Sequence, residues 1–138
     1  MVLEDYVTDD FCLPFFYEKI KRTQTMNMGA SHCHNHFEIY YLLSGERNYF
    51  IENRIYSVKP GDVILIPKEV LHKTTTLTKG EHERIVINAS EDWVADDVRG
   101  CFFCHCLHVP PAQRSVIEEI FSRIENEYKN VDSFSFKL

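Results

Sequence analysis

The sequence lacks three features that would place a protein in a membrane, outside the cell or on nucleic acid. Its longest apolar runs are about five residues, whereas a membrane-spanning helix needs about 20. The first residues, Met1 to Tyr6, lack the basic and apolar regions of a signal peptide, so we expect a cytoplasmic location. Fifteen basic residues against 21 acidic ones give a net charge of −6, which argues against an electrostatic nucleic-acid binder.

Cysteine is also scarce, and its count is odd. Three of the five cysteines are Cys101, Cys104 and Cys106. Without an export signal, reduced thiols are a better interpretation than a disulfide framework. The Cys-x-x-Cys pair has no distant second pair of the kind that structural zinc sites use. Two alternatives stay open for this cluster: buried cysteines that act as small apolar residues, and a zinc or redox site.

Apolar residues, in contrast, are plentiful enough for one core. With 138 residues, 44% of them hydrophobic, the chain is expected to form a single domain. Residues 31–90 have a β pattern throughout, after a mixed lead-in over residues 1–30, and from residue 91 the pattern becomes helical. We therefore expect a β-barrel with its lead-in over residues 1–90. A helical segment over residues 91–138 should complete the same domain.

The β region consists of short segments separated by turn signals. The turns are predicted at Ser44-Gly45, Asn53-Arg54, Lys59–Asp62 and Lys79-Gly80. Strands of about five residues joined by tight turns predict a sandwich or barrel. The predicted strands are 39–43, 48–51, 55–58, 63–66, 74–77 and 84–87.

The most informative segment runs from His32 to Glu38. Residues two apart lie on one face of an extended strand, so four polar side chains are predicted to project together. They are His32, His34, His36 and Glu38, and Tyr40 shares their face. Imidazole and carboxylate groups gathered beside an apolar run indicate a pocket rather than ordinary surface.

The face opposite the histidines is apolar, so another element must cover it. Its members are Phe37, Ile39, Tyr41 and Leu43. Residues 114–130 predict that cover, because their apolar side chains recur at helical spacing with charged residues between them. The apolar stripe consists of Val116, Ile117, Ile120, Phe121, Ile124 and Tyr128. The helix is expected either to pack on its own barrel or to pair with the same helix of a second copy in a homodimer.

Two spaced motifs carry a resemblance to a known fold. The run His32-x-His34-x3-Glu38-x6-Gly45, followed by Gly61-x5-Pro67-x4-His72, resembles the paired motifs of cupins. The residue sequence around these motifs resembles the N-terminal sensor domain of AraC-type transcriptional regulators, over residues 28–130. The segments that carry this resemblance are His-Asn-His-Phe-Glu-Ile-Tyr-Tyr-Leu-Leu-Ser-Gly, then Val-Lys-Pro-Gly-Asp-Val-Ile-Leu-Ile-Pro and Leu-His-Lys.

The resemblance implies a mainly β fold, a cupin-type double-stranded β-helix (jelly-roll barrel) with C-terminal α-helices packed outside. It implies that a divalent ion would be held by His32, His34, Glu38 and His72. Zn, Ni, Fe or Mn would suit such ligands. The alternative is a metal-free pocket in which these residues, with His36 and Tyr40, contact a small molecule. No cofactor is certain from the sequence.

Regulators of the AraC type also carry a basic tandem helix-turn-helix region, and none is present in these 138 residues. We therefore expect a non-enzymatic domain that senses a small-molecule effector, such as a sugar, and forms a homodimer. It would control DNA binding by a region outside this chain. The runner-up is a small metal-dependent cupin enzyme, an isomerase or dioxygenase. A third hypothesis is a metabolite-binding cupin without regulatory output.

Overall fold

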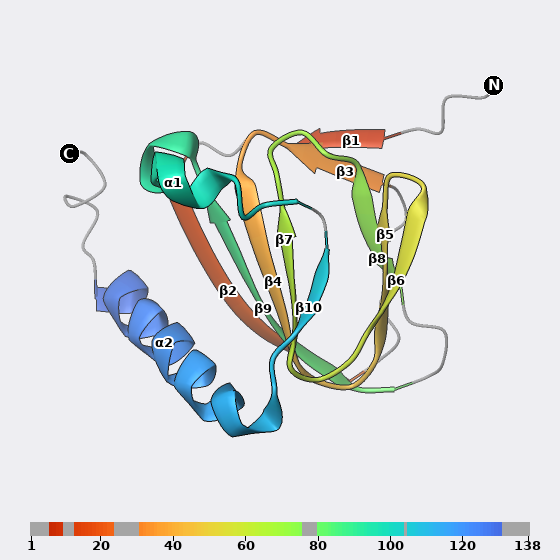
Figure 1. Cartoon of the computed structure of the whole chain (residues 1–138), viewed down its shortest axis with the longest axis vertical. Coiled ribbons are helices and arrows are strands. Elements are labelled where there is room, and N and C mark those ends of the chain that lie inside the picture. The colour runs from red at the N-terminus through yellow and green to blue at the C-terminus, as the bar shows by residue number, and fades with distance from the viewer. Residues whose placement is uncertain (1–5, 10–12, 24–30, 76–79, 104, 131–138) are drawn as a thin grey trace.

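The computed structural model describes residues 6–9, 13–23, 31–75, 80–103 and 105–130. Within them, two five-stranded sheets face each other and one long helix lies outside (Figure 1). Sheet I has the order β1 (Tyr6–Asp9), β3 (Ser31–His34), β8 (His72–Thr75), β5 (Arg47–Ile51) and β6 (Arg54–Val58). Sheet II has the order β10 (Cys106–His108), β7 (Asp62–Ile66), β4 (Phe37–Ser44), β9 (His82–Ala89) and β2 (Phe15–Arg22).

The strands predicted from turn signals are present. The described pairs are antiparallel except β1 with β3, as expected for a sandwich or barrel of short strands. The predicted strand at 74–77 corresponds to β8, which begins at His72, and residues 76–79 lie outside the described part. The strand predicted at 84–87 is longer and forms β9.

Three strands were not predicted, and two of them, β1 and β2, lie in the lead-in. In the lead-in, β2 pairs with β9 from Phe15↔Ala89 to Arg22↔His82 and forms the outer strand of sheet II. The charged residues of β2 made it unlike a core strand in the sequence, because an edge strand tolerates charged side chains that a central strand does not. The third is β10, only three residues long, in a segment expected to be helical. The same segment does contain a 3₁₀ turn (Glu91–Trp93), α1 (Asp96–Arg99) and α2 (Pro111–Asn130).

The core between the sheets follows from strand alternation. Every second side chain of β4, β5 and β7 enters this space, which excludes water from their apolar surface. The fully buried members are Tyr40, Leu42, Tyr49, Ile51, Val58, Ile64 and Ile66. The polar side chains described below therefore lie among buried aromatic and branched residues, not in open solvent.

The outer face of sheet II is covered by α2, as the apolar strand face predicted (Figure 1). Phe121 is the buried residue of the helix, and its ring centroid lies 5.1 Å from that of Tyr41. Tyr41 also donates a hydrogen bond of 3.2 Å to the Glu118 carboxylate. Burying a phenylalanine side chain contributes about 1.5–3 kcal/mol, so Phe121 is the main anchor of the helix.

Both motif glycines are required by the backbone. Gly45 has a φ of +88°, and a Cβ there would lie 2.4 Å from the Glu81 carbonyl oxygen. Gly61 has a φ of +89°, and a Cβ would lie 2.4 Å from Nε of Arg114 at the start of α2. Side chains are strained in this conformation at both positions. At Gly45 a Cβ would also collide with the backbone, whereas at Gly61 it would displace the end of the Arg114 side chain. The two motif glycines thus form turns that lie close to the start of β9 and to Arg114 of α2.

Among the described residues, no helix combines the length and the apolar character needed to cross a membrane.

Candidate metal centre and ligand pocket

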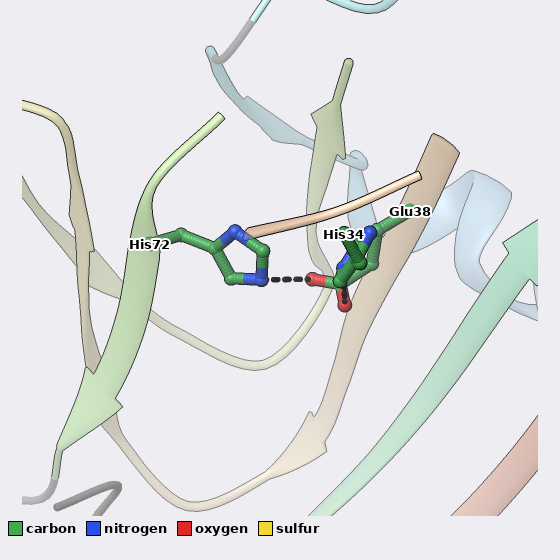
Figure 2. A group of neighbouring side chains, drawn as sticks. All are labelled: His34, Glu38 and His72. Carbon is green, nitrogen blue, oxygen red and sulfur yellow. Dashed lines mark hydrogen bonds and ion pairs between the residues drawn. The ribbon is translucent and has the colours of Figure 1, made fainter. Parts of the chain in front are cut away.

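Three predicted ligands meet inside the fold: His34 from the end of β3, Glu38 from β4 and His72 from β8 (Figure 2). Their ligand atoms all lie within 4.8 Å of one another. Nε2 of His34 is 3.3 Å from one Glu38 carboxylate oxygen, and Nε2 of His72 is 3.7 Å from the other. All three side chains are buried. Strands from both sheets therefore converge on one carboxylate.

The orientation of both imidazole rings is fixed by the backbone. Nδ1 of His34 donates to the carbonyl oxygen of His36 at 2.9 Å, and Nδ1 of His72 donates to that of Val70 at 2.8 Å. A carbonyl oxygen only accepts hydrogen bonds, so each Nδ1 carries a proton. Each Nε2 is then left to face Glu38. Metal-binding histidines are commonly held in this way, with the second ring nitrogen donating to a carbonyl.

Tyr49 of β5 completes the surroundings of Glu38. Its hydroxyl donates to the second Glu38 oxygen, and its ring stacks on His72 with centroids 5.9 Å apart. Burial by itself raises the pKa of Glu38, but the hydrogen bond from His34, the charge of both imidazoles and the Tyr49 hydroxyl outweigh it and lower that pKa to about 2. Glu38 is therefore an anion at neutral pH.

The group needs positive charge between its nitrogens and Glu38. Two neutral rings protonated on Nδ1 would turn nitrogen lone pairs toward a carboxylate, which is repulsive. Protons on Nε2 remove this repulsion, and so does one divalent cation. Two imidazole nitrogens and a carboxylate form a donor set that suits Zn, Fe, Mn or Ni, so these residues fit a metal ion. A metal held by His34, Glu38 and His72 would supply a Lewis acid to a bound oxygen atom.

The fourth predicted ligand, His32, is described only by its backbone. Its Cα pairs with that of His72 where β3 meets β8. Its side chain lies outside the described residues. Its part in a metal site stays a prediction.

The expectation of one continuous strand from His32 to Glu38 is wrong. The chain leaves β3 after His34 and enters sheet II at Phe37, so alternation does not carry across Asn35 and His36. His36 is buried, but its Nε2 bonds with the Leu13 carbonyl oxygen at 2.7 Å and its Nδ1 with the Asn35 side chain at 2.8 Å. It connects the crossover to the segment before β2. Its carbonyl oxygen contacts His34, but the hydrogen bonds of its ring go to Leu13 and Asn35 and not to the His34–Glu38–His72 group.

Tyr40, the remaining pocket candidate, is 2% exposed in the core between the sheets. Its ring meets the Tyr49 ring edge-on at a centroid distance of 5.0 Å. Sequence analysis missed Tyr49, which contacts Glu38 directly. The alternation of β5 could have placed Tyr49 on an inner face, but only the pairing of Tyr49 with Thr74, next to His72, brings it to the site.

The six predicted dimerisation residues divide into two sets on α2. Those that pack on sheet II are Ile117, Phe121, Ile124 and Tyr128. Val116 and Ile120 instead are 57% and 49% exposed. Because they are four residues apart, they lie side by side on the helix. The helix therefore buries one apolar face on its own sheet and presents a second, narrower one.

The cysteine cluster is spread over different surroundings. Cys101 is exposed, Cys106 is half-buried, and Cys104 lies outside the described residues. Burial, and then the neighbouring Asp62 carboxylate, raises the pKa of Cys106 to about 12, which keeps its thiol protonated. In the described ranges, the group around Glu38 is the one set of side chains with metal-binding geometry.

Comparison with known families identifies one match over most of the chain. The family described as AraC-like ligand binding domain matches residues 18–134. No curated protein matches the chain.

Several solved structures share the fold. An RmlC-like cupin family protein with a double-stranded β-helix fold from Methanocaldococcus jannaschii has a TM-score of 0.50 and 18% identity, covering 55% of this chain and 70% of that one. ToxT from Vibrio cholerae has a TM-score of 0.55 and 14% identity, covering 78% of this chain and 47% of ToxT. DMSP lyase DddQ from Ruegeria pomeroyi has a TM-score of 0.50 and 22% identity, covering 59% and 41%. These matches confirm the predicted cupin-type fold.

Proposed function

This chain belongs to the AraC-like ligand-binding domain family, and from that premise we propose that it binds a small-molecule effector between its two sheets. It would act as the sensing and dimerising part of an AraC-type transcriptional regulator. The chain spans 47% of the length of ToxT and 41% of that of DddQ. A region outside these residues would bind DNA, and the regulator would act in the cytoplasm.

The observation that carries this proposal is the buried polar group around Glu38. A carboxylate and two imidazoles lie within the core, 7%, 4% and 2% exposed for Glu38, His34 and His72. Burying such groups costs free energy that apolar residues of similar volume would not cost. A protein that needed only a stable core would gain by replacing them. A bound ligand or ion explains why they are there.

The second face of α2 supports dimerisation. Val116 and Ile120 expose apolar surface on a helix that is already anchored by Phe121. In a symmetric dimer the same face of each helix would pack against its mate. Such a contact would remove these side chains from water and couple two sensing domains. The acidic chain itself would not bind duplex DNA specifically.

The second candidate function is a small metal-dependent cupin enzyme, an isomerase or dioxygenase. The donor set of His34, Glu38 and His72 favours it, and a lyase is among the proteins that share the fold. It predicts turnover that depends on a divalent metal. The sensing function predicts a stable complex with an unchanged small molecule.

The test is thermal unfolding in the presence of defined ligand classes: neutral sugars, aliphatic and aromatic carboxylic acids, and sugar phosphates. An effector at 100 times its dissociation constant stabilises the folded state by about 2.7 kcal/mol, which is several degrees in the unfolding midpoint. Glu38→Gln should reduce the shift by about half or more, whereas Glu46→Gln, the same change at an exposed turn, should preserve it. Absence of any shift across all classes would contradict the proposal.

A further inference from the structure

A second polar cluster lies between the sheets, away from Glu38. Strand pairing locates it: Glu38 is opposite Asn88, and Arg84 is opposite Leu42, four residues further along β4. His82 follows on the same face of β9 and pairs with Arg22 of β2. Arg47 enters the same end of the core from β5. We call the cluster of Arg22, Arg47, His82 and Arg84 the arginine end.

The arginine end places positive charge deep in the protein. Arg47 is 5% exposed, and its Nη2 donates to the Thr74 hydroxyl at 2.8 Å. Tyr40 and Arg84 are among the groups close enough to act on it electrostatically. Arginine stays charged in proteins, so this is a buried cation rather than a neutral donor.

Donors at this end remain available. His82 is 2% exposed, and its Nδ1 has no hydrogen-bond partner among the described residues. The buried Nη1 of Arg84 also has none in the same ranges, although its Nη2 pairs with Glu18 at 3.3 Å. Buried donors without acceptors cost about 1–3 kcal/mol each, and more when charged. Such groups commonly indicate an ion or ligand.

The charges at the arginine end are unbalanced. Arg22, Arg47 and Arg84 bring three positive charges, and within the described ranges the structure pairs one carboxylate with them, that of Glu18 with Arg84. Burial, followed by the charges of Arg47, Arg84 and Arg22, lowers the pKa of His82 to about 4. Apart from burial, three guanidinium charges thus act on the His82 ring, and the same positive potential attracts anions.

The position of His82 is fixed by the turn before β5. A Cβ on Gly45 would lie 2.7 Å from the His82 Cβ, so only glycine allows this close approach. The turn therefore closes over His82 and keeps its ring within the fold. Fixed donors bind an anion with less loss of entropy than mobile surface side chains.

We propose that the arginine end binds an oxyanion, a carboxylate or phosphate group, with Arg84 and His82 donating to it beside Arg47. This deepens the proposed function, on which it rests for the claim that the ligand is an effector: the effector is then an anionic metabolite and not a neutral sugar. The guanidinium of arginine matches both oxyanions through paired N–H donors.

The experiment uses acetate and inorganic phosphate as probes, with chloride at equal ionic strength as the reference. The side-chain NMR signals of Arg84 and His82 should shift saturably with one of the two probes, which also decides between carboxylate and phosphate. Arg84→Gln should weaken that binding about tenfold or more, the effect of losing a charge-assisted hydrogen bond. Lys21→Gln removes the same charge from the exposed face of β2 and should leave binding unchanged.

Arg84→Lys guards against misfolding of the glutamine variant. It keeps the charge but loses the planar pair of donors, so binding should weaken severalfold in a folded protein. Unsaturable shifts with both probes would overturn the inference, as would equal binding by wild type and both Arg84 variants. A neutral effector that requires Glu38 but is indifferent to Arg84 would also overturn it while supporting the proposed function. If the chain binds the oxyanion but forms no dimer and responds to no effector, the oxyanion site is supported and the proposed function is contradicted.

Discussion

Replacing Glu38 by glutamine changes the charge at the centre of the site and almost nothing of its shape. The carboxylate accepts from the Tyr49 hydroxyl and lies beside the imidazoles of His34 and His72. Glutamine offers one acceptor and one donor group in place of two acceptors. The glutamine amide would therefore replace the anion that the Tyr49 hydroxyl and the two imidazoles face in the wild type, and one of these groups would meet an amide donor.

The size of the effect follows from the pKa of Glu38. A folded-state pKa of about 2, below the usual 4.5, means that ionised Glu38 stabilises the fold at pH values above 4.5. That stabilisation is lost as the pH falls from 4.5 toward 2, because the unfolded chain takes up the proton first. The shift corresponds to about 3 kcal/mol in total, of which about 2 kcal/mol would be lost by about pH 3.

The assay is urea unfolding of wild type and Glu38→Gln at neutral pH and at about pH 3, in chelator so that bound metal plays no part. At neutral pH the variant should be less stable by about 2–3 kcal/mol. At low pH this difference in stability should shrink by about 2 kcal/mol. The wild type then loses the stabilisation by ionised Glu38, which the variant lacks at every pH. Glu46→Gln, on an exposed turn, should show neither effect.

A variant as stable as wild type at neutral pH would refute the reasoning, since it would show that the carboxylate is not the favoured partner of Tyr49 and the imidazoles. A stability difference that stays constant with pH would refute the lowered pKa of Glu38 while leaving the packing argument intact.

Three further predictions concern the helix and the metal. The chain should form dimers in sedimentation equilibrium, weakened about tenfold or more by Ile120→Asp but not by Ser122→Asp on the other exposed side of the helix; a wild type that stays monomeric would remove the dimer. Phe121→Ala should cost about 3–5 kcal/mol in urea unfolding, and a loss under about 1 kcal/mol would show that α2 is not anchored there. Zn²⁺ should raise the unfolding midpoint of wild type and of His105→Asn, which is exposed, but not of His72→Asn; equal shifts in all three would place the metal elsewhere.

The parts of the fold that were predictable depend on short-range pattern. The strand with Ile39 and Tyr41 and the helix with Phe121 were recognisable because their apolar residues recur at strand and helix periods. The turns at Gly45 and Gly61 were recognisable because only glycine suits them. These features follow from local backbone geometry, which neighbouring residues determine.

The parts that were missed depend on contacts between distant segments. β2 is recognised only through its partner β9, since its own sequence is too charged to resemble a core strand. Tyr49 reaches Glu38, and Arg47 reaches the arginine end, because of register between strands that no local pattern reports. The prediction for His36 was wrong for the opposite reason. It extended the alternation of side chains along a strand through the crossover between the two sheets, where this alternation no longer applies.

The central claim is that the space around Glu38 is a ligand site, and the most direct measurement is equilibrium dialysis of the best-stabilising ligand. The account predicts one molecule bound per chain, released unchanged, with affinity reduced about tenfold or more in Glu38→Gln and unaffected in Glu46→Gln. An affinity of Glu38→Gln equal to that of the wild type, or a ligand recovered in chemically altered form, would contradict it.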